Sequence, residues 1–299
     1  MDVTTGFFNY LAHEKRYSAH TIVAYQKDIE LFVGYLKKVE RYHSLLKVHR
    51  DDIRLFVVSL VEDGMQPRTI ARKISCLKSF YKYALRTGEI KQLPTNDVSI
   101  PKISRSLPNY IPEHEITKLL TGNYFPDTFE GARDKLIIEL LYGTGLRASE
   151  IMNLTEQNIS FAESQIKVLG KRNKERIIPL NLECIEQIKR YLQYKSELPK
   201  KTDSTYLLLT KTGTKIYHTL LYKIVKYYVS LVSKNEKRSP HVLRHTFATH
   251  MLNHGASLNS IKELLGHASL SATQVYTHNS IEQLKNIHKQ AHPRGEQKK

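Results

Sequence analysis

Apolar residues recur at helical spacing through the first 92 residues of the chain. Ser18 can cap a helix whose apolar positions lie three or four residues apart, and a second helix is expected over residues 51–60. A third is expected over residues 67–88, because proline is well tolerated at the first helical position and glycine often follows the last. Residues 1–92 are therefore predicted to form a small helical domain.

A segment with little periodicity, residues 93–112, follows this region. It holds four of the ten prolines, which remove backbone donors and disfavour helix in the preceding residue, so we expect an extended linker. Residues 113–299 form the predicted second domain. Two alternating segments, Gln165–Leu169 and Arg176–Leu180, predict a β hairpin joined by GKRNKE. Helical spacing recurs in six segments: residues 127–142, 181–195, 218–233, 241–254, 258–265 and 280–290.

Both parts of the chain are basic. The formal net charge is +17; residues 1–105 hold 18 basic and 11 acidic residues, and the rest holds 28 and 18. Because the excess is spread over both predicted domains, it indicates a polyanion held by both, although charge alone does not separate DNA from RNA or an anionic membrane. The polar face of the third helix carries the candidate DNA-binding residues Arg68, Arg72, Lys73 and Lys78, together with Lys82.

The two cysteines, Cys76 and Cys184, lie in apolar helical patterns and are expected to fill the core. Two cysteines build neither a disulfide framework nor a zinc set, which fits a reducing compartment. The amino terminus has no signal-peptide pattern, and no apolar segment is long enough to span a membrane. A cytoplasmic protein is predicted.

Six polar residues in the second domain are suited to cutting a phosphodiester with a protein nucleophile. Arginine holds phosphate well because its planar fork donates two hydrogen bonds and keeps its charge. Lysine and histidine can move protons, and tyrosine can attack. Spacing of three places the first histidine and the second arginine of the set on one helix face. The six candidates, in chain order, are Arg147, Lys171, His241, Arg244, His267 and Tyr276.

Two alternatives stay open within this set. Lys174 rivals Lys171 at the other end of the hairpin connection. His241 and His245 have the spacing of a zinc-binding pair, but no carboxylate occurs between His241 and Ser260 to complete a hydrolase site. We therefore expect neither a metal nor another cofactor.

The string HVLRHTFATHMLNHGASLNSIKELLGHASLSATQVYTH resembles the signature of the tyrosine recombinases, the phage integrase family. The tail QLKNIHKQAHPR is similar to the bacterial Xer-type recombinases, the XerC and XerD group, and the likeness covers nearly the whole chain. TGLRASE matches the first arginine motif, GKRNKER the lysine hairpin, HVLR the second arginine motif, LLGH the following histidine and YTH the nucleophile. Arg172 stands where the family often has glycine.

The resemblance implies a mainly α, two-domain DNA clamp. A helical core-binding domain (residues 1–92) would precede a mostly helical catalytic domain with a small antiparallel sheet (residues 113–299). Tyr276 would form a 3′-phosphotyrosine. The resemblance makes Arg147 and Arg244 the ligands of the non-bridging oxygens. Lys171 becomes the general acid, His241 the base or positioning group, and His267 a further hydrogen-bond donor.

The implied function is site-specific recombination of duplex DNA, with chromosome dimer resolution at a dif-like site as its biological role. The partners would be a second Xer-type recombinase or further copies in a tetramer on two DNA sites, and a DNA translocase at the division septum. The last helix, with Ile281, Leu284 and Ile287 as its apolar stripe, is expected to dock on a neighbouring protomer. The alternatives are an integrase of a mobile element, a type IB topoisomerase and a catalytically silent DNA-binding regulator.

Overall fold

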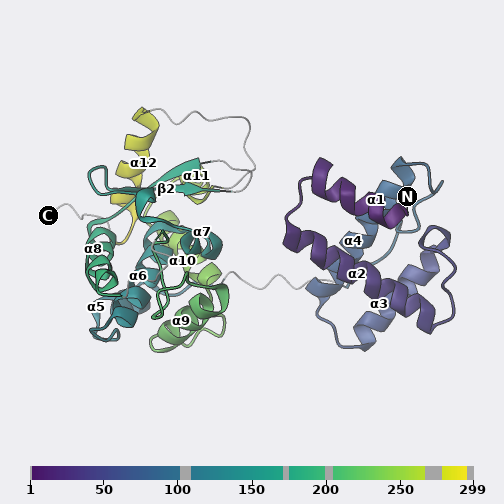
Figure 1. Cartoon of the computed structure of the whole chain (residues 1–299), viewed down its shortest axis with the longest axis horizontal. Helices are drawn as coiled ribbons and strands as arrows, with labels where there is room; N and C mark the ends of the chain where they lie inside the picture. Colours follow the sequence, from purple (N-terminus) through teal and green to yellow (C-terminus); the bar gives the residue numbers. More distant parts are fainter. Residues whose placement is uncertain (1, 102–108, 171–174, 199–204, 267–277, 295–299) are drawn as a thin grey trace. The chain divides into compact units, whose positions relative to one another are not determined.

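The computed structural model describes residues 2–101, 109–170, 175–198, 205–266 and 278–294, with the backbone alone for residues 278–283. The chain divides into two compact units, residues 1–105 and 106–299, and each has its own hydrophobic core (Figure 1). None of the helices in the described part of the chain combines the length and hydrophobicity that a bilayer crossing requires.

The amino-terminal unit is a set of helices around an aromatic core. The hydroxyl of Ser18 accepts a hydrogen bond from the Thr21 amide at 3.2 Å where α2 begins, and α4 begins at Pro67, as the sequence predicts. Each of four helices buries one phenylalanine: Phe7, Phe32, Phe56 and Phe80. The elements are α1 (Val3–Asn9), a π-helical segment (Tyr10–Glu14), α2 (Ala19–Lys38), a 3-10 turn (Leu45–Lys47), α3 (Arg50–Glu62) and α4 (Pro67–Arg86).

The basic face predicted on α4 is only partly exposed. Arg68 and Lys82 are exposed, but Lys73 is buried. The Lys73 ammonium donates to Asp28 Oδ1 at 3.0 Å, and Arg72 hydrogen-bonds the other oxygen of the same carboxylate. Asp28 belongs to α2 and is itself buried. The placement of Lys73 on the exposed face is therefore wrong, because a buried carboxylate from another helix takes up its charge.

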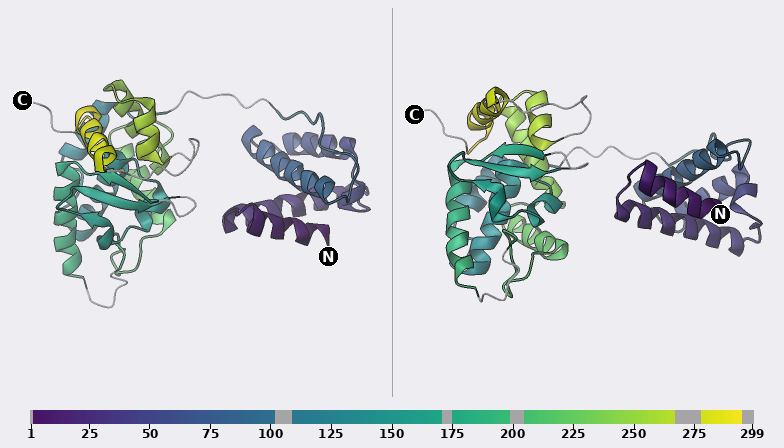
Figure 2. Two further views of the ribbon diagram at one scale, coloured as in Figure 1. Left: turned by 90° about the horizontal axis from the view of Figure 1, so that it is seen from above. Right: turned by 45° about the horizontal axis from the view of Figure 1, so that its top comes forward.

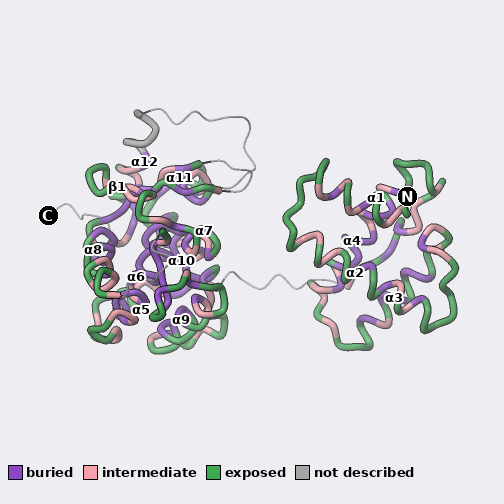
Figure 3. Tube along the Cα trace, viewed as in Figure 1, coloured by how far each residue is buried: buried purple, intermediate pink, exposed green. Residues whose placement is uncertain are grey.

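The carboxy-terminal unit is built around α6, whose residues are almost all buried. The helix is apolar around most of its circumference and packs against α8 and α10, where buried segments gather (Figure 3). Its helices are α5 (Glu113–Thr121), α6 (Phe129–Thr144), α7 (Ala148–Met152), a 3-10 turn (Glu156–Asn158), α8 (Leu182–Ser196), α9 (His218–Ser230), α10 (Pro240–Asn253), α11 (Leu258–Leu265) and α12 (His278–Ala291).

A small antiparallel sheet lies beside these helices. Its strands are β1 (Ile159–Ser160), β2 (Gln165–Leu169) and β3 (Glu175–Pro179), in the order β1-β2-β3. The β2–β3 hairpin is the predicted one, and β1 is too short to show an alternating pattern. β3 packs against α11 and α12 (Figure 2). The mainly helical fold with a small antiparallel sheet is therefore confirmed.

The last helix packs onto its own unit. Leu284 is buried, and Ile287 packs against the core of the carboxy-terminal unit. The His288 ring bonds to the Gly143 carbonyl at the end of α6, with Nε2 2.7 Å from the oxygen. The prediction that the apolar stripe docks on a neighbouring protomer is wrong for Leu284 and Ile287, because they pack in the core of their own unit, where β3, α10 and α11 lie against α12. The side chain of Ile281 lies outside the described part.

Candidate functional site

Arg147 and Arg244 come together where the turn after α6 meets α10. Arg147 immediately precedes α7, in extended backbone, and Arg244 lies on α10. The turn between α6 and α7 depends on Gly145, which has a φ of 62°. A Cβ added to Gly145 would lie 2.5 Å from Phe247 Cδ1, so glycine is required both by the backbone conformation and by the close approach of α10.

The carboxy-terminal end of α11 orients three arginines. A helix end of this kind carries partial negative charge on carbonyls that have no partner within the helix, so it suits guanidinium groups. Three consecutive carbonyls each accept from a different arginine. The pairs are Arg176 Nε to Leu264 O at 3.0 Å, Arg244 to Leu265 O at 2.7 Å, and Arg147 to Gly266 O at 3.2 Å.

Glu150 is the carboxylate that these arginines share. Arg176 donates one hydrogen bond to each of its oxygens, both at 2.8 Å, and the Arg147 side chain donates to Oε1 at 2.7 Å. Arg244 lies 4.0 Å from Oε2. Burial by itself would raise the pKa of Glu150, but the hydrogen bonds from Arg176 and Arg147 outweigh it and lower the pKa to about 2. Glu150 is therefore ionised at neutral pH.

Three guanidinium charges against one carboxylate leave the site cationic. Burial, reinforced by the charge of Arg147, lowers the pKa of Arg244 to about 10, so Arg244 still carries its proton at neutral pH. Each guanidinium has five N–H donors, and within the described residues the side chains of Arg147 and Arg244 make two hydrogen bonds each. The remaining donors and the uncompensated charge are suited to binding an anion.

The other predicted residues are placed less fully. His241 is exposed in the first turn of α10, three residues before Arg244. The remaining candidates lie outside the described residues. These are Lys171, its rival Lys174, His267 and Tyr276. In the sequence, Gly266 directly precedes His267, and β2 and β3 flank the connection that holds Lys171 and Lys174.

Two residues of this arrangement, Glu150 and Arg176, are not among the six candidates that the sequence indicates. Glu150 lies in the TGLRASE motif, where a glutamate three residues after a helix start often reaches back to the backbone. It does so here, accepting from the Arg147 amide at 2.8 Å. The alternating pattern predicts Arg176 only as the first residue of a strand. Its inward position, two residues before the buried Ile178, was the signal that it does not face solvent.

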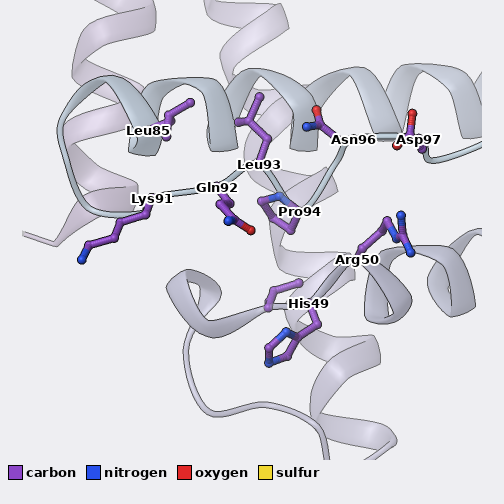
Figure 4. Close-up of a pocket in the computed structure, with 10 residues that line it drawn as sticks. His49, Arg50, Leu85, Lys91, Gln92, Leu93, Pro94, Asn96 and Asp97 are labelled. Atoms are coloured by element: carbon purple, nitrogen blue, oxygen red, sulfur yellow. The ribbon is translucent and has the colours of Figure 1, made fainter.

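A cavity of about 690 Å³ lies elsewhere, in the amino-terminal unit between the start of α3 and residues 91–97 (Figure 4). Arg50, Lys91 and Asp97 are among its lining residues, and it contains none of the candidate residues.

Comparison with known proteins shows the family. The model of the Phage integrase family matches residues 109–283, and that of the phage integrase N-terminal SAM-like domain matches residues 4–88. Tyrosine recombinase XerC of Thermodesulfovibrio yellowstonii is 39% identical over 293 residues, covering 97% of this chain and 95% of the relative. Tyrosine recombinase XerD of Staphylococcus haemolyticus is 36% identical over 291 residues, covering 96% and 97%.

Solved structures share the fold. The XerH site-specific recombinase bound to a palindromic difH substrate superposes with a TM-score of 0.73 at 22% identity, covering 95% of this chain and 83% of that one. The Tn1549 transposon integrase in complex with transposon right end DNA gives a TM-score of 0.71 at 20% identity, covering 95% and 98%.

The chain therefore belongs to the phage integrase family. Within that family it is a site-specific DNA recombinase of the tyrosine type, similar to both XerC and XerD.

Proposed function

We propose that the chain cuts and rejoins duplex DNA with Tyr276 as the nucleophile. The Tyr276 hydroxyl loses its proton and attacks the scissile phosphorus, and the bond to the 5′-oxygen breaks, which leaves a 3′-phosphotyrosine and a free 5′-hydroxyl. The 5′-hydroxyl of a partner strand then attacks this ester, restores the phosphodiester and releases Tyr276. One ester replaces another in each step, so no ATP is needed. The arginines supply the positive charge that a metal ion would otherwise provide, so the proposed reaction needs no metal ion.

The observation that carries the proposal is the convergence of Arg147 and Arg244 on Glu150 and the end of α11. Cleavage builds negative charge on the non-bridging oxygens of a five-coordinate phosphorus, and fixed cationic donors stabilise that charge without having to reorganise. Two arginines fixed by the same helix end, with donors left over, are suited to this task.

The remaining roles follow the family motifs. Lys171 protonates the leaving 5′-oxygen, His267 adds a hydrogen bond to the phosphate, and His241 accepts the Tyr276 proton or positions the hydroxyl. Residues 1–92 form the core-binding domain. There Arg68, Arg72 and Lys78 contact DNA phosphates. Arg72 and Lys73 both bond to Asp28, but Arg72 remains exposed whereas Lys73 is buried.

The similarity to XerC and XerD over nearly the whole length supports a more specific role. The protein acts in the cytoplasm as four protomers on two dif-like sites, together with a second Xer-type recombinase or with further copies of itself. It resolves chromosome dimers before cell division, and a DNA translocase at the septum activates it.

A nicked suicide substrate tests the chemistry. A nick near the cut lets the short 5′-hydroxyl fragment diffuse away, so the covalent adduct accumulates and can be counted on a denaturing gel. The wild-type protein should form this adduct in excess EDTA, and Tyr276→Phe should bind the same DNA but form none. Adduct from Tyr276→Phe, or cutting that requires added Mg²⁺, would contradict the mechanism. Recombination of two sites, without relaxation of single-site plasmids, separates the protein from a type IB topoisomerase.

A further inference from the structure

Arg176 bonds both to Glu150 and to the end of α11, and no role in the proposed reaction has been assigned to it. It lies on β3, immediately after the hairpin connection that carries Lys171, and it is 4% exposed. Its two terminal nitrogens donate to the two oxygens of Glu150 at 2.8 Å each, while Nε donates to Leu264 O at 3.0 Å. All three nitrogens of the guanidinium are therefore engaged in one plane.

The bonds from the two terminal nitrogens of Arg176 fix the orientation of the Glu150 carboxylate. Because Arg176 holds both oxygens, the carboxylate plane cannot turn. Oε1 is then presented to the Arg147 side chain at 2.7 Å, and Oε2 to the Arg147 amide at 2.8 Å. Oε2 also faces Arg244 at 4.0 Å. The orientation of both arginines thus depends on a carboxylate that Arg176 fixes.

The bond from Nε of Arg176 fixes the carboxy-terminal end of α11. Arg176 holds the Leu264 carbonyl, and the next two carbonyls along the chain hold Arg244 and Arg147. The Arg176 side chain also lies against Gly266, where an added Cβ would be 3.0 Å from Arg176 Cδ. Gly266 has a φ of 64°, and the residue that follows it is His267. The bonds to Glu150 and the bond to the end of α11 therefore both hold groups that are proposed to contact the phosphate.

We propose that Arg176 is a positioning residue for DNA cleavage, which holds Arg147 and Arg244 in place through Glu150 and the end of α11. The inference rests on the proposed function, since Arg147 and Arg244 are taken as the phosphate ligands. Arg176 is not assigned the phosphate itself, because all three nitrogens of its guanidinium already bond within the protein. Its contribution is the geometry of the fork, which lysine lacks even though lysine keeps the charge.

The test compares Arg176→Lys with Arg133→Lys in the full-length protein. Arg133 is a matched control, because it is also buried, bonds a carboxylate (Asp134, 2.8 Å) and reaches a backbone carbonyl. It lies in the amino-terminal half of α6, whereas Gly145 follows the carboxy-terminal end of that helix. Both variants are measured in single-turnover cleavage of the nicked substrate at saturating protein, with DNA affinity measured separately.

Arg176→Lys should cleave about 10- to 100-fold more slowly than wild type, because slight displacement of preorganised charge is costly to the transition state. Its DNA affinity should stay within about twofold of wild type, because the phosphate contacts that set affinity are retained. Arg133→Lys should cleave at close to the wild-type rate per folded molecule.

A second substrate distinguishes positioning from loss of folded protein. A methylphosphonate at the cut has lost one charged non-bridging oxygen, so it depends less on the two arginines. The deficit of Arg176→Lys should therefore shrink on this substrate. The rates on the phosphodiester and on the methylphosphonate are measured with the same preparation of each variant. Their ratio therefore does not depend on the fraction of the protein that is folded.

Equal deficits on both substrates, or a wild-type rate for Arg176→Lys on the phosphodiester, would overturn the inference. A wild-type protein that forms no adduct would instead overturn the proposed function, so the two failures are distinguishable.

Discussion

Acid should destabilise the carboxy-terminal unit through two buried histidines. His288 and His292 are stacked with ring centroids 5.0 Å apart, and both are almost fully buried. The Gly143 carbonyl only accepts, so His288 Nε2 carries its proton. His292 Nδ1 accepts from the Arg294 amide at 3.1 Å, so it carries none. A second proton on His292 would sit on Nδ1, where it would point at the N–H group of the Arg294 amide. The packing therefore selects the neutral rings.

The sign of the effect follows from the pKa shifts. Burial lowers the pKa of His288, and burial together with the neighbouring His288 ring lowers that of His292 well below the ordinary value of 6.5. The unfolded chain then binds more protons than the folded one below pH 6.5. The stabilisation is complete above that pH and is lost as the pH falls through it. The raised pKa of the buried Glu139 acts in the opposite sense, since its folded state gains a proton in acid.

The magnitude is set by linkage. Between about pH 7.5 and about pH 5.5, a histidine that stays neutral in the folded protein costs up to about 1.4 kcal/mol of unfolding free energy. Two such rings cost up to about 3 kcal/mol, which corresponds to a fall of roughly 5–11 °C in Tm for a unit of this size. Because Glu139 opposes this change, a comparison between variants is more informative than the total.

The assay is urea denaturation of the full chain, followed by circular dichroism at both pH values. His292→Gln keeps a donor and an acceptor but cannot titrate, so its loss of stability in acid should be about 1.4 kcal/mol smaller than that of wild type. His114→Gln, which removes an exposed imidazole from α5, should show the wild-type loss. If wild type and His292→Gln lose the same stability, the ring is not held neutral and the reasoning is refuted.

The chemistry, the basic face and the last helix can be tested in the same way. Lys171→Ala should slow cleavage much more than Lys174→Ala. A substrate with a 5′-bridging sulfur, whose leaving group needs no proton, should restore the cleavage rate of Lys171→Ala. Rescue of Lys174→Ala alone would mean that Lys174 is the general acid. Neutralising the exposed Arg68 and Lys82 together should reduce the log–log salt slope of DNA binding by about one to two, and an unchanged slope would place DNA on another surface. Leu284→Ala should lower the stability of a single protomer by about 2–5 kcal/mol in urea denaturation, whereas a helix docked in trans would leave it unchanged.

Local patterns were sufficient where the interactions are local. The start of α2 after Ser18 and of α4 at Pro67 follows from capping and φ preferences, which act within one turn. Helical spacing over residues 127–142 predicted α6, and alternation predicted the β2–β3 hairpin. The chain order of the family motifs led to the recombinase class, which the comparisons confirm.

Charge pairing between distant segments could not be predicted in this way. Lys73 looked exposed on its own helix, but Asp28, 45 residues earlier, neutralises it in the core. The last helix looked free to dock elsewhere, but His288 binds a carbonyl 145 residues earlier in the chain. Both outcomes depend on which groups the fold brings within hydrogen-bond distance.

The sequence by itself therefore determined the helices, the hairpin and the residue types available for phosphodiester chemistry, because capping, periodicity and motif spacing act over a few residues. Only the tertiary structure decided how those residues are held. It brings Arg147, Arg176 and Arg244 from three segments onto Glu150 and the end of α11, and it leaves the surplus positive charge at one place. Electrostatic convergence of this kind depends on distances in space, which residue spacing along the chain does not specify.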